Sequence, residues 1–435
     1  MSTHRVISVL LSALAVQAVM AQPRALTIEQ SIHLGLENSK VFHSSLMKSE
    51  YASAKAGEVK AALFPSVKVQ ASYQRLSSVP EFKIPFPGIP TIFPYIANTY
   101  AARASFQQPL FTGWKLQGAA DNASYQAEAA QSDVVRDKAE LILAVKTAYW
   151  NVHRAGEVRR LAEENVSQVE SHLGDIENLA RQGMATTNDV LKVKVQLANS
   201  RILLSDASNN LRLATISFNS TVGLPLETEI LIESPLSFTS DKRMEAEKLL
   251  KTALVSRPEL IGMELRVKAA DAAVVAASGG WFPQVFLTGN YYYARPNQRI
   301  IPSVDKFNDT WDFGVSLQFE LWNNLTTWHQ TGQAKAQREQ VRDALGIVRD
   351  GIVLEVTQSY LNWRQSTERI KLSELSVQQA EENYRMASEK FKAGVMTSSD
   401  LLDAEVMLLQ SKLQLTHSLV EHELAAAKLE KVVGR

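Results

Sequence analysis

The sequence of 435 residues contains no cysteine, only 19 glycines and 14 prolines, and no excess of either charge. The absence of cysteine excludes disulfide bonds, thiolate metal sites, cysteine nucleophiles and cysteine-linked lipid anchors. The 46 basic and 46 acidic residues cancel, so the chain lacks the basic character typical of nucleic-acid-binding proteins. Few glycines argue against an all-β protein, because such a protein needs many turns. The composition therefore predicts a folded, mainly helical chain.

The first 21 residues have the pattern of a secretory signal peptide. His4 and Arg5 precede an apolar run at residues 6–16, and small residues lead to a cleavage site after Ala21. The run is shorter than the roughly 20 residues that a membrane-spanning helix needs. We therefore expect residues 1–21 to direct export and to be removed.

Two further uncharged stretches are also unsuited to a transmembrane helix. Residues 84–102 contain four prolines, and residues 272–294 are interrupted by Gly279, Gly280 and Pro283. If the chain enters a bilayer, we expect it to do so as β-strands closed into a barrel.

An internal duplication organises the chain. Phe64-Pro65-Ser66-Val67 recurs 218 residues later as Phe282-Pro283-Gln284-Val285, and further along the offset is 211, as for Gly183 and Gly394. The difference of seven residues is expected between the strands of each half, where the first half has the longer loop. We predict two structural repeats, at residues 22–225 and 226–435.

Each repeat is predicted to contain a helix, two strands, a very long helix, a glycine-containing turn and a last helix. Apolar residues at heptad spacing indicate coiled coils, and a helix of 69 residues is about 100 Å long, so it needs parallel neighbours. The first repeat is expected to have helices 26–62, 114–182 and 187–222, with strands at about 65–75 and 100–110. The second is expected to have helices 243–278, 325–393 and 398–433, with strands at about 283–294 and 310–322.

The strands carry the more specific signal. In residues 311–321 every odd position is apolar and every even position is polar or glycine, as in a strand that crosses an outer membrane. The strand at 283–294 is less regular, because Phe286 and Tyr292 fall on its polar face. An edge of a soluble sheet is a poorer interpretation, since the apolar faces have no Lys or Glu to prevent edge pairing. Aromatic residues expected in girdles at the membrane surfaces are Tyr73, Tyr100, Tyr291, Tyr293, Trp311 and Trp322.

Four strands cannot close a barrel, so several copies must contribute. An eight-stranded barrel is filled by its own side chains, and the polar inward faces imply water. A trimer with 12 strands is therefore the smallest workable assembly. The same trimer would gather its long helices into a helical barrel. The predicted fold class is mainly α with a membrane β part.

Short motifs accompany this layout: Leu26-Thr27-Ile28-Glu29-Gln30, the two Phe-Pro strand starts, Pro109-Leu110-Phe111-Thr112-Gly113, and the turns at 183–191 and 394–402. With these motifs, the layout resembles the TolC family of outer-membrane efflux proteins over nearly all of the mature chain. The resemblance implies a homotrimer in the outer membrane with a long periplasmic extension. It also implies an exit duct for tripartite efflux or type I secretion, with a periplasmic adaptor and an inner-membrane transporter of RND, ABC or MFS type.

The turns between the long and the last helices are the candidate functional sites. Thr186 and Thr397 are expected as N-caps, with Asp189 at the third helical position as in a capping box. Asp400 and Asp403 lie three residues apart on one helix face, and three copies would place six carboxylates around a narrow end. Such a ring favours cations, and the resemblance supports it, since family members carry acidic rings at matching positions.

The resemblance also exposes departures. Phe391 and Met396 stand where the family's best-known member has the Tyr and Arg that hold its tip closed, so the lock is expected to differ. Two turn pairs match the family's adaptor-docking loops: Gly183-Met184 and Gly394-Val395. Their simpler interpretation is a helix-ending glycine in the left-handed conformation.

No enzyme motif was found, and His417 and His422 are spaced unsuitably for a metal pair. We therefore expect no catalytic residues, no metal and no cofactor. The alternatives are a soluble periplasmic coiled-coil scaffold or pump adaptor, which would not need the alternating strands, and a general diffusion porin, which would lack the long helices. The transported substrate does not follow from the sequence.

Overall fold

The structure is a computed structural model that describes residues 24–78, 95–233 and 245–434. The predicted signal peptide at residues 1–21 lies outside the described residues, as do the four prolines between 85 and 94.

The chain divides into two compact units, each built from segments that are far apart in the sequence. The unit called here the tip unit comprises residues 1–46, 134–258 and 349–435, and the sheet unit comprises residues 47–133 and 259–348. Each unit combines residues of both predicted repeats, whose boundaries remain a prediction from the sequence.

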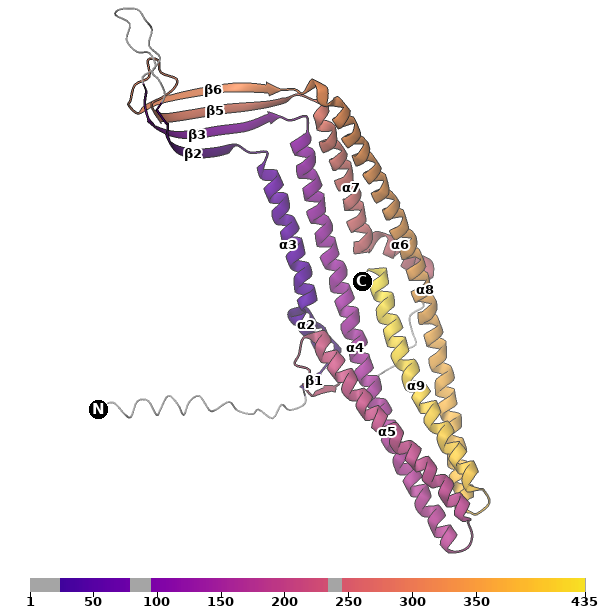
Figure 1. The fold of residues 1–435 in the computed structure, drawn as a ribbon. Helices are drawn as coiled ribbons and strands as arrows, with labels where there is room; N and C mark the ends of the chain where they lie inside the picture. The colour runs from indigo at the N-terminus through magenta and orange to yellow at the C-terminus, as the bar shows by residue number, and fades with distance from the viewer. Residues whose placement is uncertain (1–23, 79–94, 234–244, 435) are drawn as a thin grey trace, which may run out of the picture. The chain divides into compact units, whose positions relative to one another are not determined.

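Four long helices dominate the chain, and their bounds lie within a residue of those expected from the heptad pattern and the caps. They are α4 (Lys115–Arg181), α5 (Thr187–Val222), α8 (Asn324–Lys392) and α9 (Ser398–Val433). In the tip unit α5 lies beside α4, and α9 lies beside α8 (Figure 1). Apolar residues of all four helices pack into one cluster near the turns: Val169, Ile176, Val193, Leu197, Ala387, Phe391, Leu401 and Ala404.

The two shorter predicted helices are each broken once, which corrects the expectation of continuous helices at 26–62 and 243–278. The first consists of α2 (Ile28–Asn38) and α3 (Lys40–Ala61), and the second of α6 (Ala246–Ser256) and α7 (Pro258–Ser278). Arg257 is extended, with ψ of 124°, because a residue before proline disfavours the helical conformation. Ser39 is extended as well, and its hydroxyl accepts a hydrogen bond from Phe42 N at 3.3 Å.

The sheet unit contains an antiparallel sheet of four strands in the order β2-β3-β5-β6. The strands are β2 (Ser66–Arg75), β3 (Asn98–Phe111), β5 (Gln284–Arg295) and β6 (Asn308–Gln318). The longer hairpin connection lies in the first half, between β2 and β3, in agreement with the change of offset. The last strand ends four residues before the predicted 322, because Leu321–Asn323 form a 3₁₀ turn that leads into α8.

The alternation expected from the sequence gives this sheet one apolar and one polar face. Register pairs Tyr73 with Tyr100 and Tyr291 with Trp311, so that the apolar positions of neighbouring strands share a face. The side chains of this face are largely exposed in the single chain, including Val69, Trp311, Phe313, Val315 and Leu317. Such a large exposed apolar face needs a partner or an apolar medium.

A second, two-stranded sheet in the tip unit was not predicted. Strand β1 (Arg24–Leu26) pairs in parallel with β4 (Ile230–Ile232), and the Tyr149 hydroxyl donates to Leu26 O at 3.1 Å. Leu26 and Tyr149 are buried with Phe218 in an apolar core. This sheet fixes the start of the described chain against α4 and α5.

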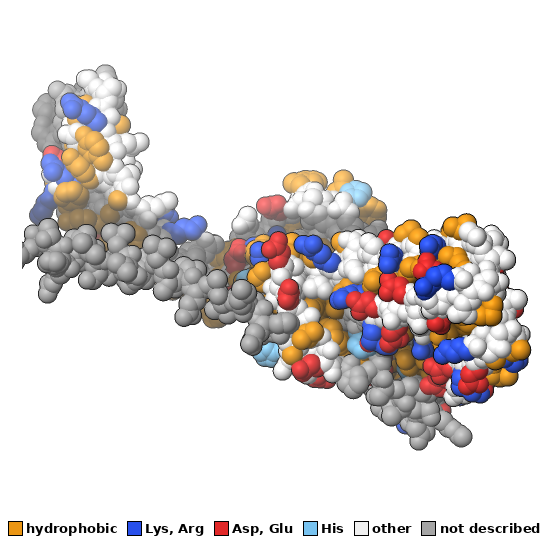
Figure 2. Space-filling model, turned by 90° about the horizontal axis from the view of Figure 1, so that it is seen from below, with side chains coloured by type: hydrophobic (Ala, Val, Ile, Leu, Met, Phe, Trp, Pro, Cys, Tyr) orange, Lys and Arg blue, Asp and Glu red, His pale blue; other side chains and the backbone are white. Residues whose placement is uncertain are grey.

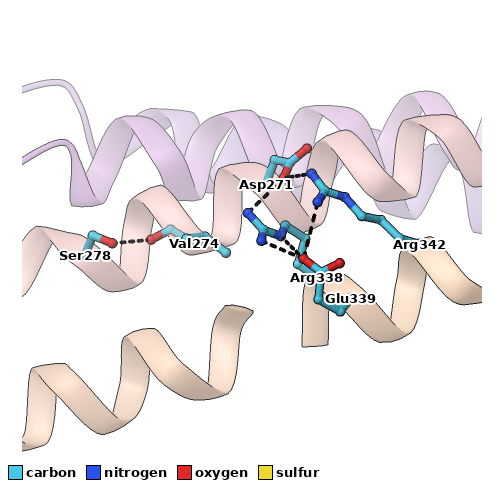
Figure 3. Close-up of polar contacts among 6 residues, drawn as sticks. All are labelled: Asp271, Val274, Ser278, Arg338, Glu339 and Arg342. Carbon is cyan, nitrogen blue, oxygen red and sulfur yellow. Dashed lines mark hydrogen bonds and ion pairs between the residues drawn. The ribbon is translucent and has the colours of Figure 1, made fainter. Parts of the chain in front are cut away.

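An ion-pair network joins two helices of the sheet unit, α7 and α8. Asp271 on α7 accepts a hydrogen bond from Arg342 on α8 at 3.2 Å and lies 3.8 Å from Arg338, while Glu339 binds both arginines (Figure 3). The network therefore carries no net charge and holds the two helices in register. Among the described residues, no helix combines the length and the apolar character needed to cross a membrane.

Candidate functional site

The two helix turns of the tip unit have closely similar geometry. Gly183 has φ of 76° and Gly394 has φ of 73°, the left-handed conformation that glycine adopts without strain. Met184 N then bonds to Leu179 O at 2.9 Å, and Val395 N bonds to Lys390 O at 3.0 Å. These bonds satisfy carbonyl groups at the helix ends, as in a Schellman motif.

Each turn exposes an apolar side chain directly after its glycine. Met184 is 65% exposed and Val395 is 74% exposed. The helix-ending interpretation of the two glycines is therefore correct in geometry, and adaptor docking stays a prediction. Figure 2 looks onto the tip unit from the side of the turns, where hydrophobic side chains lie among charged ones of both signs. A protein partner would meet a mixed surface there.

The caps of α5 and α9 lie where the sequence predicts them, but they differ in one bond. Thr186 Oγ1 accepts from Asp189 N at 3.2 Å, and Asp189 Oδ2 accepts in return from Thr186 N at 3.1 Å, which completes a capping box. Thr397 Oγ1 accepts from Asp400 N at 3.2 Å and donates to Asp400 Oδ2 at 2.7 Å. The first turn of α5 therefore has both bonds of a capping box, whereas that of α9 lacks the return bond to the backbone N–H of Thr397.

The Asp189 carboxylate is stabilised in its charged form by this cap. Hydrogen bonds from the Thr186 hydroxyl and then from its backbone N–H hold the pKa of Asp189 below its usual range, and nearby Lys192 acts in the same direction. This is the structural role that the sequence suggested for Asp189.

The predicted acidic pair is exposed at the start of α9. Asp400 and Asp403 are both exposed and lie on neighbouring turns of the same helix face. The structure adds a cation to this surface: Lys192, the repeat counterpart of Asp403, donates to Ser399 Oγ at 3.1 Å. Each tip therefore presents two carboxylates with one ammonium group close by. The role of the pair as a selectivity ring stays a prediction.

Phe391 and Met396, the departures from the family pattern, lie inside the tip core. Phe391 is buried, and its ring lies 5.1 Å from that of His172, while Met396 is half-buried against the same cluster. Both residues therefore contribute apolar packing between the helices, at the positions where the family's best-known member has its Tyr and Arg links.

A buried polar cluster in this core escaped the sequence analysis. His172 of α4 lies with Nδ1 3.4 Å from Glu405 Oε2 and Nε2 3.0 Å from Ser398 Oγ, both on α9. The side chains of His172 and Glu405 are 1% and 2% exposed. The sequence does place both residues on the packed side of their helices. His172 follows Val169 by three residues and Glu405 follows Leu401 by four, the spacings of buried positions in a coiled coil.

Five of the six predicted girdle residues lie in the half of the sheet next to the hairpin loops, and Trp322 lies beyond its other end. Tyr73 and Tyr100 have ring centroids 5.0 Å apart near the hairpin loops, and Tyr293 stacks on Phe307, which the sequence analysis missed, at 5.1 Å. Tyr291 and Trp311 pair in register, and both are exposed. Trp322 is 98% exposed but lies in the 3₁₀ turn beyond β6, at the helix end of the sheet.

A second aromatic group at the helix end was also missed. The Trp114 ring lies 5.1 Å from Phe111 and 5.1 Å from Phe282, edge to face. The sheet therefore carries aromatic residues at both of its ends, as a membrane-embedded sheet does.

Comparisons with known proteins agree with this geometry. The model of the family described as outer membrane efflux protein matches residues 32–224 and 249–435. Outer membrane protein TolC of Vibrio cholerae is 22% identical over 348 residues, which are 78% of each chain. The probable efflux pump outer membrane protein TtgC of Pseudomonas putida is 22% identical over 304 residues, which cover 68% of this chain and 60% of TtgC.

A solved structure shows the same fold. The outer-membrane channel OprN superposes with a TM-score of 0.80 at 18% sequence identity, covering 94% of this chain and 89% of OprN. The expected fold, with long helices and a smaller β part, is thereby confirmed.

Proposed function

The chain belongs to the outer membrane efflux protein family, and we propose that three copies form one duct for substrates that leave the cell. An outer-membrane location and a role as an export channel follow from the family. Membership also excludes the alternative of a soluble scaffold or adaptor. Proteins of this family are channels, through which a substrate passes without being chemically changed.

The observation that carries the trimer is the unclosed sheet. Its order leaves β2 and β6 at the edges within the described part of the chain, and every residue of β2 is exposed. Unpaired edges and an exposed apolar face are both unfavourable in a finished protein. Pairing β2 of one copy with β6 of the next would close three sheets into a 12-stranded barrel and turn the apolar face to the lipid.

The helices of the tip unit support the same assembly. Apolar side chains stay exposed along their seams, among them Val195 and Ile202 on α5 and Leu361 and Leu372 on α8. Neighbouring copies would bury them in a helical barrel. Val195 and Ile202 are seven residues apart, a heptad spacing that suits such lateral packing.

The partners belong to the proposal as well. A periplasmic adaptor would dock on the turns through exposed Met184 and Val395, and an inner-membrane transporter of RND, ABC or MFS type would supply the energy. At the same end, Asp400 and Asp403 of three copies would form an acidic ring that favours cations. TtgC is named as part of an efflux pump, which supports efflux as the transport process.

The test is purification from outer membranes, determination of the mass, and insertion into planar bilayers. We expect the mass of three chains and stepwise ion conductance. A monomer without conductance would contradict the proposal. Replacement of Val69 and Phe313 by Lys, which charges the apolar face, should abolish insertion, whereas Lys at Ser316 on the polar face should be tolerated.

A further inference from the structure

Five residues from four segments meet on the polar face of the sheet. They are Arg103 of β3, Asn290 and Tyr292 of β5, Asp312 of β6, and Arg299 of the loop between β5 and β6. Register places Tyr292 directly opposite Arg103 and Asn290 directly opposite Asp312. Tyr292 is one of the two residues that interrupt the alternation of β5, and its place on the polar face puts its ring beside Arg103.

Hydrogen bonds run through the cluster without a break. Arg103 donates from Nε and Nη2 to Asn290 Oδ1 at 3.2 and 2.7 Å, and Asn290 Nδ2 donates to Asp312 Oδ1 at 2.7 Å. The other oxygen of the carboxylate, Asp312 Oδ2, accepts from Arg299 Nη2 at 2.6 Å. One carboxylate thus orients two arginines, one of them through an amide.

Both guanidinium groups also lie over the same aromatic ring. Arg103 Cζ is 5.0 Å and Arg299 Cζ is 4.1 Å from the centre of the Tyr292 ring, within the range of cation–π attraction. Attraction to the electron-rich ring face offsets part of the repulsion between the two cations. The single carboxylate of Asp312 can neutralise only one of the two arginines. The Tyr292 ring helps to hold the second arginine close to the first.

The cluster retains positive charge and hydrogen-bond donors. Two arginines and one aspartate leave a net charge of about +1 in each chain, and Lys68 of β2 adds another cation on the same face. A guanidinium has five N–H groups. Within the described part of the chain Arg103 uses two of these in hydrogen bonds and Arg299 uses one. The remaining donors can bind a passing anion.

The position of the cluster follows from the register. Arg103 lies between Ala102 and Ala104 of the apolar face, so it points to the opposite side from Tyr100 and Tyr293. In the proposed trimer, on which this inference rests, the aromatic face meets lipid and the cluster faces the lumen. Three copies would place six guanidinium groups and three carboxylates around the interior of the barrel.

We propose that Arg103 and Arg299, held over Tyr292, form a cationic ring inside the barrel that favours anions or substrates with carboxylate or phosphate groups at the outer exit. The ring has the opposite charge to the acidic pair at the tip. A molecule leaving the duct therefore meets two charge filters in succession. Guanidinium groups suit such a filter because they stay charged at all physiological pH values and bind oxyanions with paired donors.

The test measures the chloride-to-potassium permeability ratio from reversal potentials of single channels in a KCl gradient. R103Q and R299Q should each lower the ratio, and the double variant should lower it by at least about twofold. D312N removes the only carboxylate of the cluster and should raise the ratio. R103K and R299K keep the positive charge and should retain most of the wild-type preference for chloride.

Arg295 provides the matched control, since it is an arginine of β5, the strand of Tyr292, but lies on the apolar face and pairs with Asp305 at 2.7 Å. R295Q should leave the ratio unchanged. An unchanged ratio in both the double arginine variant and D312N would overturn the inference while leaving the duct intact. A wild-type protein that forms no channel would instead contradict the proposed function.

Discussion

His172 and Glu405 form a buried polar contact between two helices of the tip, with 3.4 Å between Nδ1 and Oε2. Burial raises the pKa of the nearby Tyr384 hydroxyl, and the Glu405 side chain acts in the same direction. Ser398 binds the other imidazole nitrogen at 3.0 Å. The contact joins α4 to the start of α9, and Phe391 of α8 covers the imidazole.

We predict that breaking this contact on one side destabilises the tip strongly. H172A would leave the buried Glu405 side chain without this partner, and a buried polar group left unsatisfied costs about 1–3 kcal/mol. Replacement of both residues by leucine should recover most of that loss, because an apolar pair avoids the desolvation of two polar groups. Thermal unfolding of the single and double variants measures the coupling.

The exposed pair His417 and Glu421, with 3.0 Å between Nε2 and Oε1, is the matched control for this experiment. H417A should cost less than about 1 kcal/mol, because solvent screens exposed pairs. Equal losses at both sites would contradict the assignment of the effect to burial.

The sequence could predict this region only in part, and the reason is physical. Heptad spacing and caps located α5 and α9 to the residue, because both signals are local. His172 and Glu405 are 233 residues apart, and their contact depends on which helices pack together. The heptad pattern marks both as seam positions without identifying the partner helix.

The sheet was predictable to a similar degree. Alternation identified all four strands and their apolar face, since that pattern depends only on neighbours in sequence. The contact of Arg299 with Tyr292 depends on the path of the hairpin loop, which no periodic pattern encodes. The three-residue strands β1 and β4 are too short for any period to be recognised.

We predict that the two caps of the tip differ in strength. T186A removes the cap hydroxyl from a complete capping box and should cost about 1 kcal/mol or slightly more. T397A removes the same two hydroxyl bonds, but α9 has no return bond to the backbone N–H of residue 397 that would survive the change, so its loss should be larger. Amide hydrogen exchange in the first turns of α5 and α9 measures both effects, and a larger increase at α5 would contradict this ranking.

The cap of α5 should also depend on pH. The folded state holds the pKa of Asp189 below its unfolded value of about 3.9. Its stabilising contribution is therefore fully present above about pH 4 and is lost as the pH falls through the lower, folded value. Exchange rates at the start of α5 should rise over that acidic range. In T186A, which lacks the hydroxyl that lowers this pKa, the rise should begin at higher pH.

We predict that Glu423 of α9 weakens the fold at neutral pH. Burial raises the pKa of its carboxyl, Glu430 acts in the same direction, and Lys146 opposes both. A raised pKa means that the folded state prefers the protonated acid. Stability is therefore full below the unfolded value of about 4.3 and falls as the pH rises through the folded value. E423Q should therefore stabilise the protein at pH 7 and change its stability little at pH 4.

The last prediction concerns the acidic pair of the tip. D400N with D403N should reduce the potassium-to-chloride permeability ratio, because six carboxylates would be lost from the narrow end of a trimer. K192Q should increase the ratio, since Lys192 lies beside Ser399 at the start of α9 and its charge opposes the ring. The acidic variant should lower the permeability ratio and K192Q should raise it. Because both changes lie at the same place, opposite effects would show that charge, and not a general loss of structure, is responsible. Asp400 also binds Thr397, so amide exchange in D400N and D403N must first show an intact α9. Reversal potentials that match the wild type in both variants would show that the pair does not line the ion path.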